Sequence, residues 1–299
     1  MKTRNATAAR ARPTSPKPPM RQRHDEAPGR GPPLKVKGEI RARFRAGPKV
    51  SNVFDVFESG GFRLKFPRGG RAREAVLLNA GGGLAGGDRL LLDLAVEDGA
   101  DVVFTSQAAE RVYRAEGEGC RIETRLDVSE NGRLYWLPQE TLLFDGASLE
   151  RRLDVRLASG AELALLESVV FGRLASGESA IRAALVERWR VRRAGRLIFA
   201  DETRITDGAR TLDRVAVGAG ARALATMLIC APEPEALVAR LRGAFAPSAP
   251  EREGFEAGVS LVEGLVVARA LSPDPGRLRL KLIDAIVAAT GHKPPRVWG

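Results

Sequence analysis

Short strands that end in glycine-containing turns recur along this chain and constrain its fold more than any other feature. Residues 121–128 and 152–157 alternate apolar with charged side chains, the pattern of a strand with one buried and one solvated face. Asp-Gly and Asn-Gly supply the positive φ that tight turns require. The strands of the five units span residues 90–96, 121–128, 152–157, 189–193 and 214–217. Their turns are Asp98-Gly99, Asn131-Gly132, Ser159-Gly160, Ala194-Gly195 and Ala219-Gly220, with a loose period of about 30 residues.

The recurring strands and glycine-containing turns predict a mainly β fold, a layered antiparallel, β-helix-like stack of hairpins. Helical spacing of apolar residues appears only near the C-terminus, at 232–245 and 277–290. Gly291 follows the second segment, where a helix C-cap belongs. The sequence therefore predicts a sheet core with two C-terminal helices.

The basic charge of the chain is concentrated at its N-terminus. Ten Lys and Arg residues stand against two acids up to residue 37, out of a net charge of +11. This stretch is rich in proline and has little apolar surface to bury, so we expect residues 1–37 to be disordered. Three interpretations of this stretch stay open: a dispensable extension, an arm that binds an acidic partner, and a transit peptide. Residues 38–299 are then a single domain, and no nucleic-acid partner is expected.

Ligands for a catalytic metal are scarce. The only histidines are His24 and His292, and the two cysteines, Cys120 and Cys230, are expected to be buried in a reduced, cytoplasmic protein. No apolar run approaches the length of a membrane span, about 18 residues. The sequence predicts neither a tight metal site, a tightly bound cofactor, a membrane association nor an enzyme.

Three segments carry distinctive local chemistry. The glycine-rich run 79–88 reads as a phosphate-binding loop or as a tight strand connection, and it lacks the Gly-Lys-Ser/Thr ending of a P-loop. The segment 136–146 mixes aromatic residues with Gln139 and Glu140, as in a partner surface or a strand end with core aromatics. In the segment 167–178, Glu167 follows an apolar strand and is a candidate for an inward-facing acid.

In this order, these segments resemble the urease accessory protein UreD (UreH) family. The resemblance runs over about residues 40–299. Its motifs are Gly86-Gly87-Asp88, the segment 105–114, Trp-Leu-Pro-Gln-Glu-Thr at 136–141 with Phe144-Asp145-Gly146, the segment 172–178, and Pro295-Arg296-Val297-Trp298.

The resemblance implies a scaffold that links apo-urease to UreF and, through UreF, to the GTPase UreG, for insertion of nickel. Whether the protein forms a homodimer within that complex is left undecided by the sequence. It also implies an internal tunnel with transient nickel, which carboxylates hold more weakly than His and Cys cages do. The candidates for lining this tunnel are Asp88, Glu140, Glu167 and Glu178. The alternative for each is a structural ion pair with a nearby arginine or, for Asp88, a turn cap.

The remaining motif residues are expected to serve structure or partner binding. They are Gly82, Gly83, Gly86, Gly87, Trp136, Pro138, Gln139, Phe144, Asp145, Gly172, Arg173, Gly177, Arg296 and Trp298. Three rival functions remain: a protein that binds a phosphorylated ligand at the glycine-rich loop, a nucleic-acid module that uses the basic tail, and a β-sandwich interaction domain unrelated to urease.

Overall fold

Two facing β-sheets and two long helices make up the folded part of the chain. The computed structural model describes residues 35–70, 72–173, 177–178, 181–246 and 254–299. The predicted basic tail therefore lies outside the described residues up to residue 34, and residues 174–176 of the segment 172–178 lie outside them too.

The first sheet has seven strands. In spatial order they are β14 (Arg196–Ile205), β13 (Ala184–Arg193), β11 (Ser148–Leu157), β8 (Cys120–Val128), β5 (Arg89–Val96), β1 (Lys37–Arg45) and β2 (Asn52–Ser59). The second sheet has ten strands. Eight follow one path: β16 (Glu256–Val262), β17 (Leu265–Ser272), β15 (Ala223–Cys230), β12 (Glu162–Phe171), β9 (Arg133–Trp136), β6 (Asp101–Ser106), β4 (Arg73–Asn79) and β3 (Phe62–Lys65). The short strands β10 (Thr141–Leu143) and β7 (Glu110–Val112) branch from β12.

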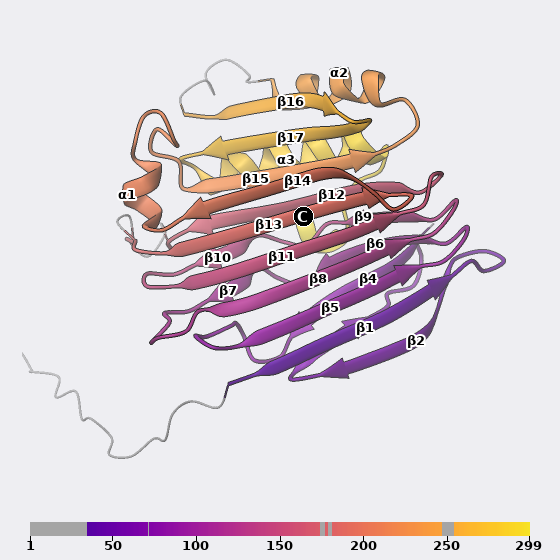
Figure 1. Cartoon of the computed structure of the whole chain (residues 1–299), viewed down its shortest axis with the longest axis horizontal. Coiled ribbons are helices and arrows are strands. Elements are labelled where there is room, and N and C mark those ends of the chain that lie inside the picture. Colours follow the sequence, from indigo (N-terminus) through magenta and orange to yellow (C-terminus); the bar gives the residue numbers. More distant parts are fainter. Residues whose placement is uncertain (1–34, 71, 174–176, 179–180, 247–253) are drawn as a thin grey trace, which may run out of the picture. The chain divides into compact units, whose positions relative to one another are not determined.

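The glycine turns mark the corners of a coil. At Gly99, Gly132 and Gly160 the chain passes from a strand of the first sheet to one of the second. Successive coils then stack in parallel, as β5, β8 and β11 do (Figure 1). The mainly β, β-helix-like expectation is confirmed, whereas the antiparallel hairpins expected at these three turns are replaced by parallel stacking. Alternation specifies which face of a strand is buried and leaves its hydrogen-bonding partner open.

Antiparallel pairing occurs where the coil begins and ends. β13 and β14 form a hairpin at Ala194-Gly195, as predicted, and both turn residues have positive φ. The strand expected at 214–217 is wrong: these residues lie in a turn after α1 (Gly208–Leu212), and Val215 is 88% exposed. Four residues of alternation are too few to define a strand when no partner edge is available.

Both C-terminal helices are confirmed. α2 spans Pro234–Phe245 and α3 spans Pro275–Thr290. Asp274 caps α3 by accepting hydrogen bonds from the N–H groups of its first turn, and Gly291 closes it in the left-handed conformation, at φ 71°. A 3₁₀ turn, η2 (Arg296–Trp298), ends the chain.

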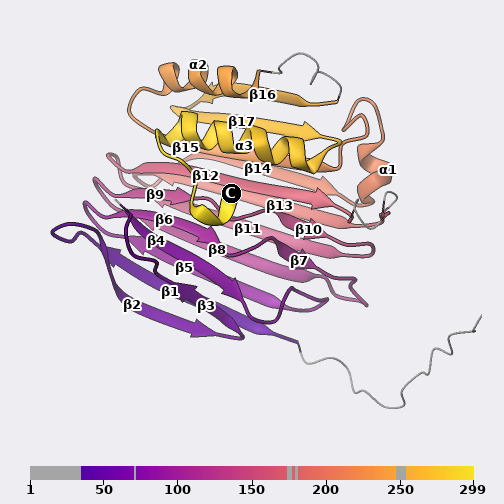
Figure 2. The ribbon, with the colours of Figure 1, turned by 180° about the vertical axis from the view of Figure 1, so that it is seen from behind.

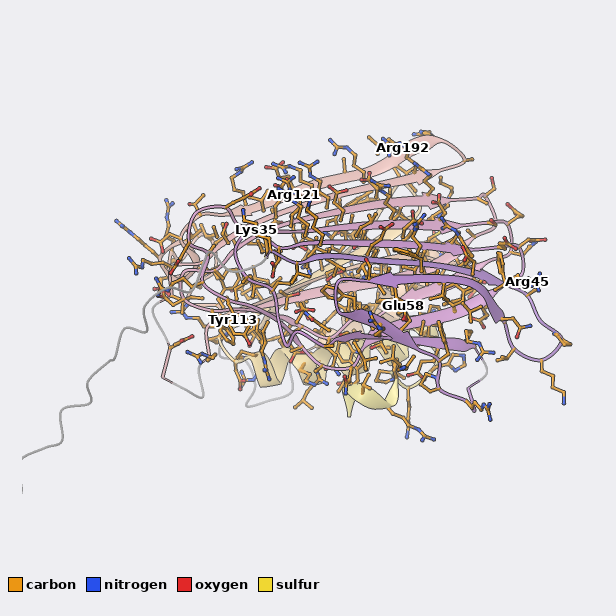
Figure 3. The ribbon with its side chains drawn as sticks, turned by 90° about the horizontal axis from the view of Figure 1, so that it is seen from below. Lys35, Arg45, Glu58, Tyr113, Arg121 and Arg192 are labelled. Atoms are coloured by element: carbon orange, nitrogen blue, oxygen red, sulfur yellow. The ribbon has the colours of Figure 1, made fainter. Side chains whose placement is uncertain are left out.

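The two apolar cores lie on opposite faces of the second sheet. One fills the space between the sheets, and the other lies under α2 and α3 (Figure 2). β12 contributes to both, so its residues 163–171 are all buried. Seen from below, the layers run from the first sheet, with Arg121 and Arg192 on its outer face, through the second sheet to α3 (Figure 3). No helix among the described residues is long and apolar enough to span a membrane.

Candidate functional site

Three cavities follow one another, and the two inner ones lie between the sheets. We name them by their position. The outer recess, of about 140 Å³, lies beside the glycine-rich loop; the central cavity holds about 50 Å³; the large cavity, of about 400 Å³, lies between β13 and β14 on one side and β15 to β17 on the other. Glu110 lines both the outer recess and the central cavity, and Glu167 lines both the central and the large cavity. A carboxylate therefore stands at each boundary.

Glu167 is the inward-facing acid that the sequence indicated. It lies on β12 with 6% of its surface exposed, and Trp136 donates a hydrogen bond from Nε1 to Glu167 Oε1 at 2.8 Å. Trp136 is itself fixed by stacking on Phe104, with ring centroids 4.1 Å apart. Burial raises the pKa of Glu167, and the positive charge of Arg151 opposes this rise.

Arg151, which is buried, and Glu187, which is partly buried, complete an interior ion cluster with Glu167, and neither was a candidate from the sequence. They are register partners on β11 and β13, and both point toward the second sheet. Arg151 Nη1 lies 2.5 Å from Glu167 Oε2, and Arg151 Nη2 lies 2.5 Å from Glu187 Oε1. Thr141 Oγ1 accepts a further hydrogen bond from Arg151 Nη1 at 3.2 Å. One cation thus faces two carboxylates, of which Glu167 is buried and Glu187 is partly buried at the large cavity.

Glu110 was also missed as a candidate. It begins β7, and Asn79 Nδ2 donates a hydrogen bond to its Oε1 at 2.9 Å. Burial raises the pKa of Glu110 to about 7, so this carboxyl exchanges its proton near neutral pH. The available signal was its place in the motif 105–114, shortly after the apolar strand β6.

The glycine-rich loop forms a wall of the outer recess. Gly82 and Gly83 line it, and Tyr113 donates a hydrogen bond from its hydroxyl to the carbonyl oxygen of Gly82 at 3.0 Å. A Cβ at Gly83 would lie 2.4 Å from the Tyr113 ring and 2.7 Å from the Arg111 carbonyl oxygen. The run thus allows close approach of two backbones, which fits the tight-connection interpretation.

The large cavity is lined by rows of polar side chains from both sheets. Thr203 lies next to Glu187 in the first sheet. Thr226 lies next to Glu167 in the second sheet, followed by Arg269. Exposed residues of β16 line its edge, so the cavity opens to solvent there.

The other three acidic candidates have different surroundings. Asp88 is buried and accepts hydrogen bonds from the N–H groups of Val36 and Ala85, at 2.7 and 2.8 Å. Glu140 pairs with Arg279 at 2.8 Å and lines a separate recess of about 120 Å³. Glu178 pairs with Arg173 at the surface. These contacts match the turn cap and the ion pairs named as alternatives, and the pairing of Glu167 with Arg151 matches the ion-pair alternative too. Of the four, Glu167 alone borders the central and the large cavity.

Two motifs hold neighbouring segments together. Phe144 contacts the Tyr113 ring edge-on, and the guanidinium carbon of Arg173 lies 4.6 Å from the centroid of the Phe144 ring. Asp145 binds Arg114 at 2.5 Å. Three glycines of the family motifs, Gly87, Gly172 and Gly177, have positive φ. Gly86 does not have a positive φ, and it packs closely against Ala115.

The C-terminal motif anchors the chain end to the second sheet. Trp298 is 2% exposed and donates from Nε1 to the carbonyl oxygen of Leu137 at 3.0 Å. Gln139 donates from Nε2 to the carbonyl oxygen of Val297. Pro138 lines the central cavity, and Arg296 lines another cavity, of about 340 Å³, against the second sheet.

Residues 36–299 match the family described as UreD urease accessory protein. The chain belongs to the UreD family. It is 42% identical to the urease accessory protein UreD of Beijerinckia indica over 253 residues, 84% of this chain and 93% of that protein. It is 41% identical to the UreD of Rhodopseudomonas palustris (strain HaA2) over 268 residues, 88% of this chain and 93% of that protein. The UreD of Methylobacterium sp. (strain 4-46) is 42% identical over 272 residues, 89% of this chain and 96% of that protein.

The resemblance to UreD drawn from five motifs is thereby confirmed. The UreD relatives are named as accessory proteins, which fits a protein that is not an enzyme. Within the described part of this UreD-family chain, no three His, Cys, Asp or Glu side chains gather as a metal cluster. Both cysteines are buried, as expected, and burial raises the pKa of the Cys120 thiol to about 12.

Proposed function

We propose that this protein promotes the maturation of urease by assisting insertion of nickel into apo-urease, in a complex with UreF and, through UreF, with UreG. Membership of the UreD family supports this role, because the relatives it matches carry the name urease accessory protein. The protein contributes a rigid scaffold, with two sheets locked to each other by their shared core.

We further propose that nickel passes between the two sheets. The observation that carries this proposal is the sharing of Glu110 and Glu167 between successive cavities. A cation that enters at the outer recess meets Glu110, then the hydroxyl groups of Ser106 and Thr141 in the central cavity, and then Glu167. Oxygen ligands hold a borderline cation such as Ni²⁺ more loosely than imidazole or thiolate, so the ion moves on.

The proton of Glu110 makes cation binding at the entry depend on pH. With a pKa of about 7, this carboxyl is partly protonated at neutral pH and loses its proton when a cation binds. Entry of the ion is then favoured at higher pH, and protonation favours its release.

Conservative substitutions test the passage. Glu110→Gln and Glu167→Gln remove one charge each and keep the size of the side chain. Glu178→Gln is the matched control, because Glu178 pairs with Arg173 at the surface. Each variant is expressed in a urease-positive strain that lacks its own UreD gene, and urease activity, urease nickel content and co-purification of UreF are measured.

We expect both interior variants to retain UreF and to yield nickel-poor urease, while the control behaves as wild type. Full activation of urease by both interior variants, with UreF bound, would contradict the proposal that nickel passes between the sheets. Failure of the unaltered protein to restore urease activity would remove the maturation role itself.

A further inference from the structure

A positively charged side chain lies between two carboxylates where the central cavity meets the large cavity. The Arg151 guanidinium lies between Glu167 and Glu187, with contacts of 2.5 Å to each carboxylate. Arg151 Nε also donates to Glu187 Oε1 at 2.7 Å. Arg151 is 4% exposed and Glu167 is 6% exposed, so water screens their attraction little.

This cluster lies at the boundary between two cavities. Arg151 lines the central cavity, Glu187 lines the large cavity, and Glu167 lines both. A cation that moves from one cavity to the other therefore meets the two carboxylates at the point where Arg151 binds them. Trp136 and Thr141 hold the cluster in place from β9 and β10.

We infer that Glu167 and Glu187 form a divalent-cation site that Arg151 occupies in the resting protein. The inference rests on the proposed function for its place in nickel passage, and on the ion cluster alone for the site itself. The guanidinium stays protonated at any physiological pH and has no acceptor atom, so it competes with a metal ion for the same carboxylate oxygens. Arg151 thus keeps the site from retaining the ion that it admits.

The charges explain why such a competitor is needed. Without Arg151, the buried Glu167 carboxylate and the partly buried Glu187 carboxylate would face each other uncompensated, and a divalent cation would neutralise both. An ion held in that way would be trapped inside the protein. With Arg151 present, the guanidinium pairs again with each carboxylate that the metal ion leaves.

Nickel binding to the full-length protein tests this inference. Arg151→Gln keeps a hydrogen-bonding side chain and removes the charge, and Arg151→Lys keeps the charge. Arg152→Gln is the matched control, because Arg152 is the next residue of β11, is 46% exposed on the outer face and pairs with Glu150. Binding of Ni²⁺ from NiCl₂ is measured by equilibrium dialysis and by the shift of the melting temperature.

We expect Arg151→Gln to gain one Ni²⁺ equivalent, bound at least about tenfold more tightly than any Ni²⁺ in the wild type. Arg151→Lys and Arg152→Gln should bind nickel as the wild type does. Arg151→Gln combined with Glu167→Gln should lose the gained equivalent, and this double variant also removes the excess buried charge if the single variant folds poorly.

Wild-type nickel binding by Arg151→Gln, or an equal gain in Arg151→Lys, would overturn the inference. The same variants separate it from the proposed function. If Arg151→Gln gains the nickel equivalent and still activates urease fully, the site stands and the passage of nickel through it fails.

Discussion

Arg151 on β11 and Glu167 on β12 meet across the space between the two sheets, with Nη1 and Oε2 2.5 Å apart. Their contact joins strands of opposite sheets in the interior, where the surrounding core residues are apolar. Removing one member of a buried ion pair is strongly destabilising, because the other charge stays buried without compensation.

The first prediction concerns the stability of this pair. Arg151→Leu leaves the buried Glu167 and the partly buried Glu187 without their counter-charge and should lower the free energy of unfolding by about 3–5 kcal/mol. Arg152→Leu, on the solvated face of the same strand, should change it by less than about 0.5 kcal/mol. Urea denaturation followed by circular dichroism measures both. Equal effects of the two substitutions would contradict the interior role of Arg151.

The second prediction is a pH dependence that arises from Glu110. Its pKa is about 7 in the folded protein, above the ordinary value of 4.5. The folded state therefore binds the proton more tightly, and its stability falls as the pH rises from the unfolded to the folded pKa. Between pH 4.5 and 7 the loss amounts to about 3 kcal/mol.

Glu110→Gln cannot lose a proton and should remove this part of the pH profile. The variant should match the wild type near pH 4.5 and exceed its stability above pH 7, as measured by urea denaturation at each pH. Parallel profiles for the two proteins would show that Glu110 does not titrate in this range.

The third prediction concerns the close approach at the glycine-rich loop. Gly83 has φ 149°, and an added Cβ would lie 2.4 Å from the Tyr113 ring. Gly83→Ala should therefore destabilise the protein by about 1–3 kcal/mol. Gly82→Ala is the control: its φ of 74° is also positive, but nothing lies within 4 Å of the added atom. A greater loss at Gly82 than at Gly83 would show that packing against Tyr113 is not the constraint.

The fourth prediction concerns the C-terminal anchor. Trp298→Phe removes the hydrogen bond from Nε1 to the carbonyl oxygen of Leu137 and keeps an aromatic ring in the pocket. It should cost about 1–2 kcal/mol, whereas Trp298→Ala should cost about 3–5 kcal/mol through the cavity it leaves. Thermal unfolding of the two variants measures the difference. A wild-type melting temperature for Trp298→Ala would contradict the anchoring role.

Much of the fold could be predicted from alternation and turns. The inward positions of β11, such as Leu153 and Val155, follow from period two, and Gly291 marks the end of α3. The parallel pairing of β8 with β11 could not be predicted, because each strand shows one apolar and one charged face whichever strand lies beside it. The strand predicted at 214–217 is a turn in the structure, because four alternating residues are too few to distinguish a strand from a turn.

The site was predictable only in part. Glu167 was identified from the apolar run that precedes it, and it lies within β12, but its partners lie on other strands of the chain. Arg151 shares the inward face of β11 with Leu153, and Glu187 shares that of β13 with Trp189, so each is a charge on an apolar face. That signal was present in the sequence. Which acid met which base depended on the stacking of the coils, which alternation does not specify.

The central claim, that nickel reaches urease through the space between the sheets, is tested most directly by closing that space without altering charge. Thr226 lines the large cavity next to Glu167, so Thr226→Trp narrows the cavity beside Glu167 and Thr226→Ser leaves it open. Apo-urease is matured with purified accessory complexes that contain either variant, and nickel per urease active site is measured. We expect nickel-poor urease with Thr226→Trp and wild-type nickel loading with Thr226→Ser, with UreF bound in both. Full nickel loading by a folded, UreF-bound Thr226→Trp protein would contradict it.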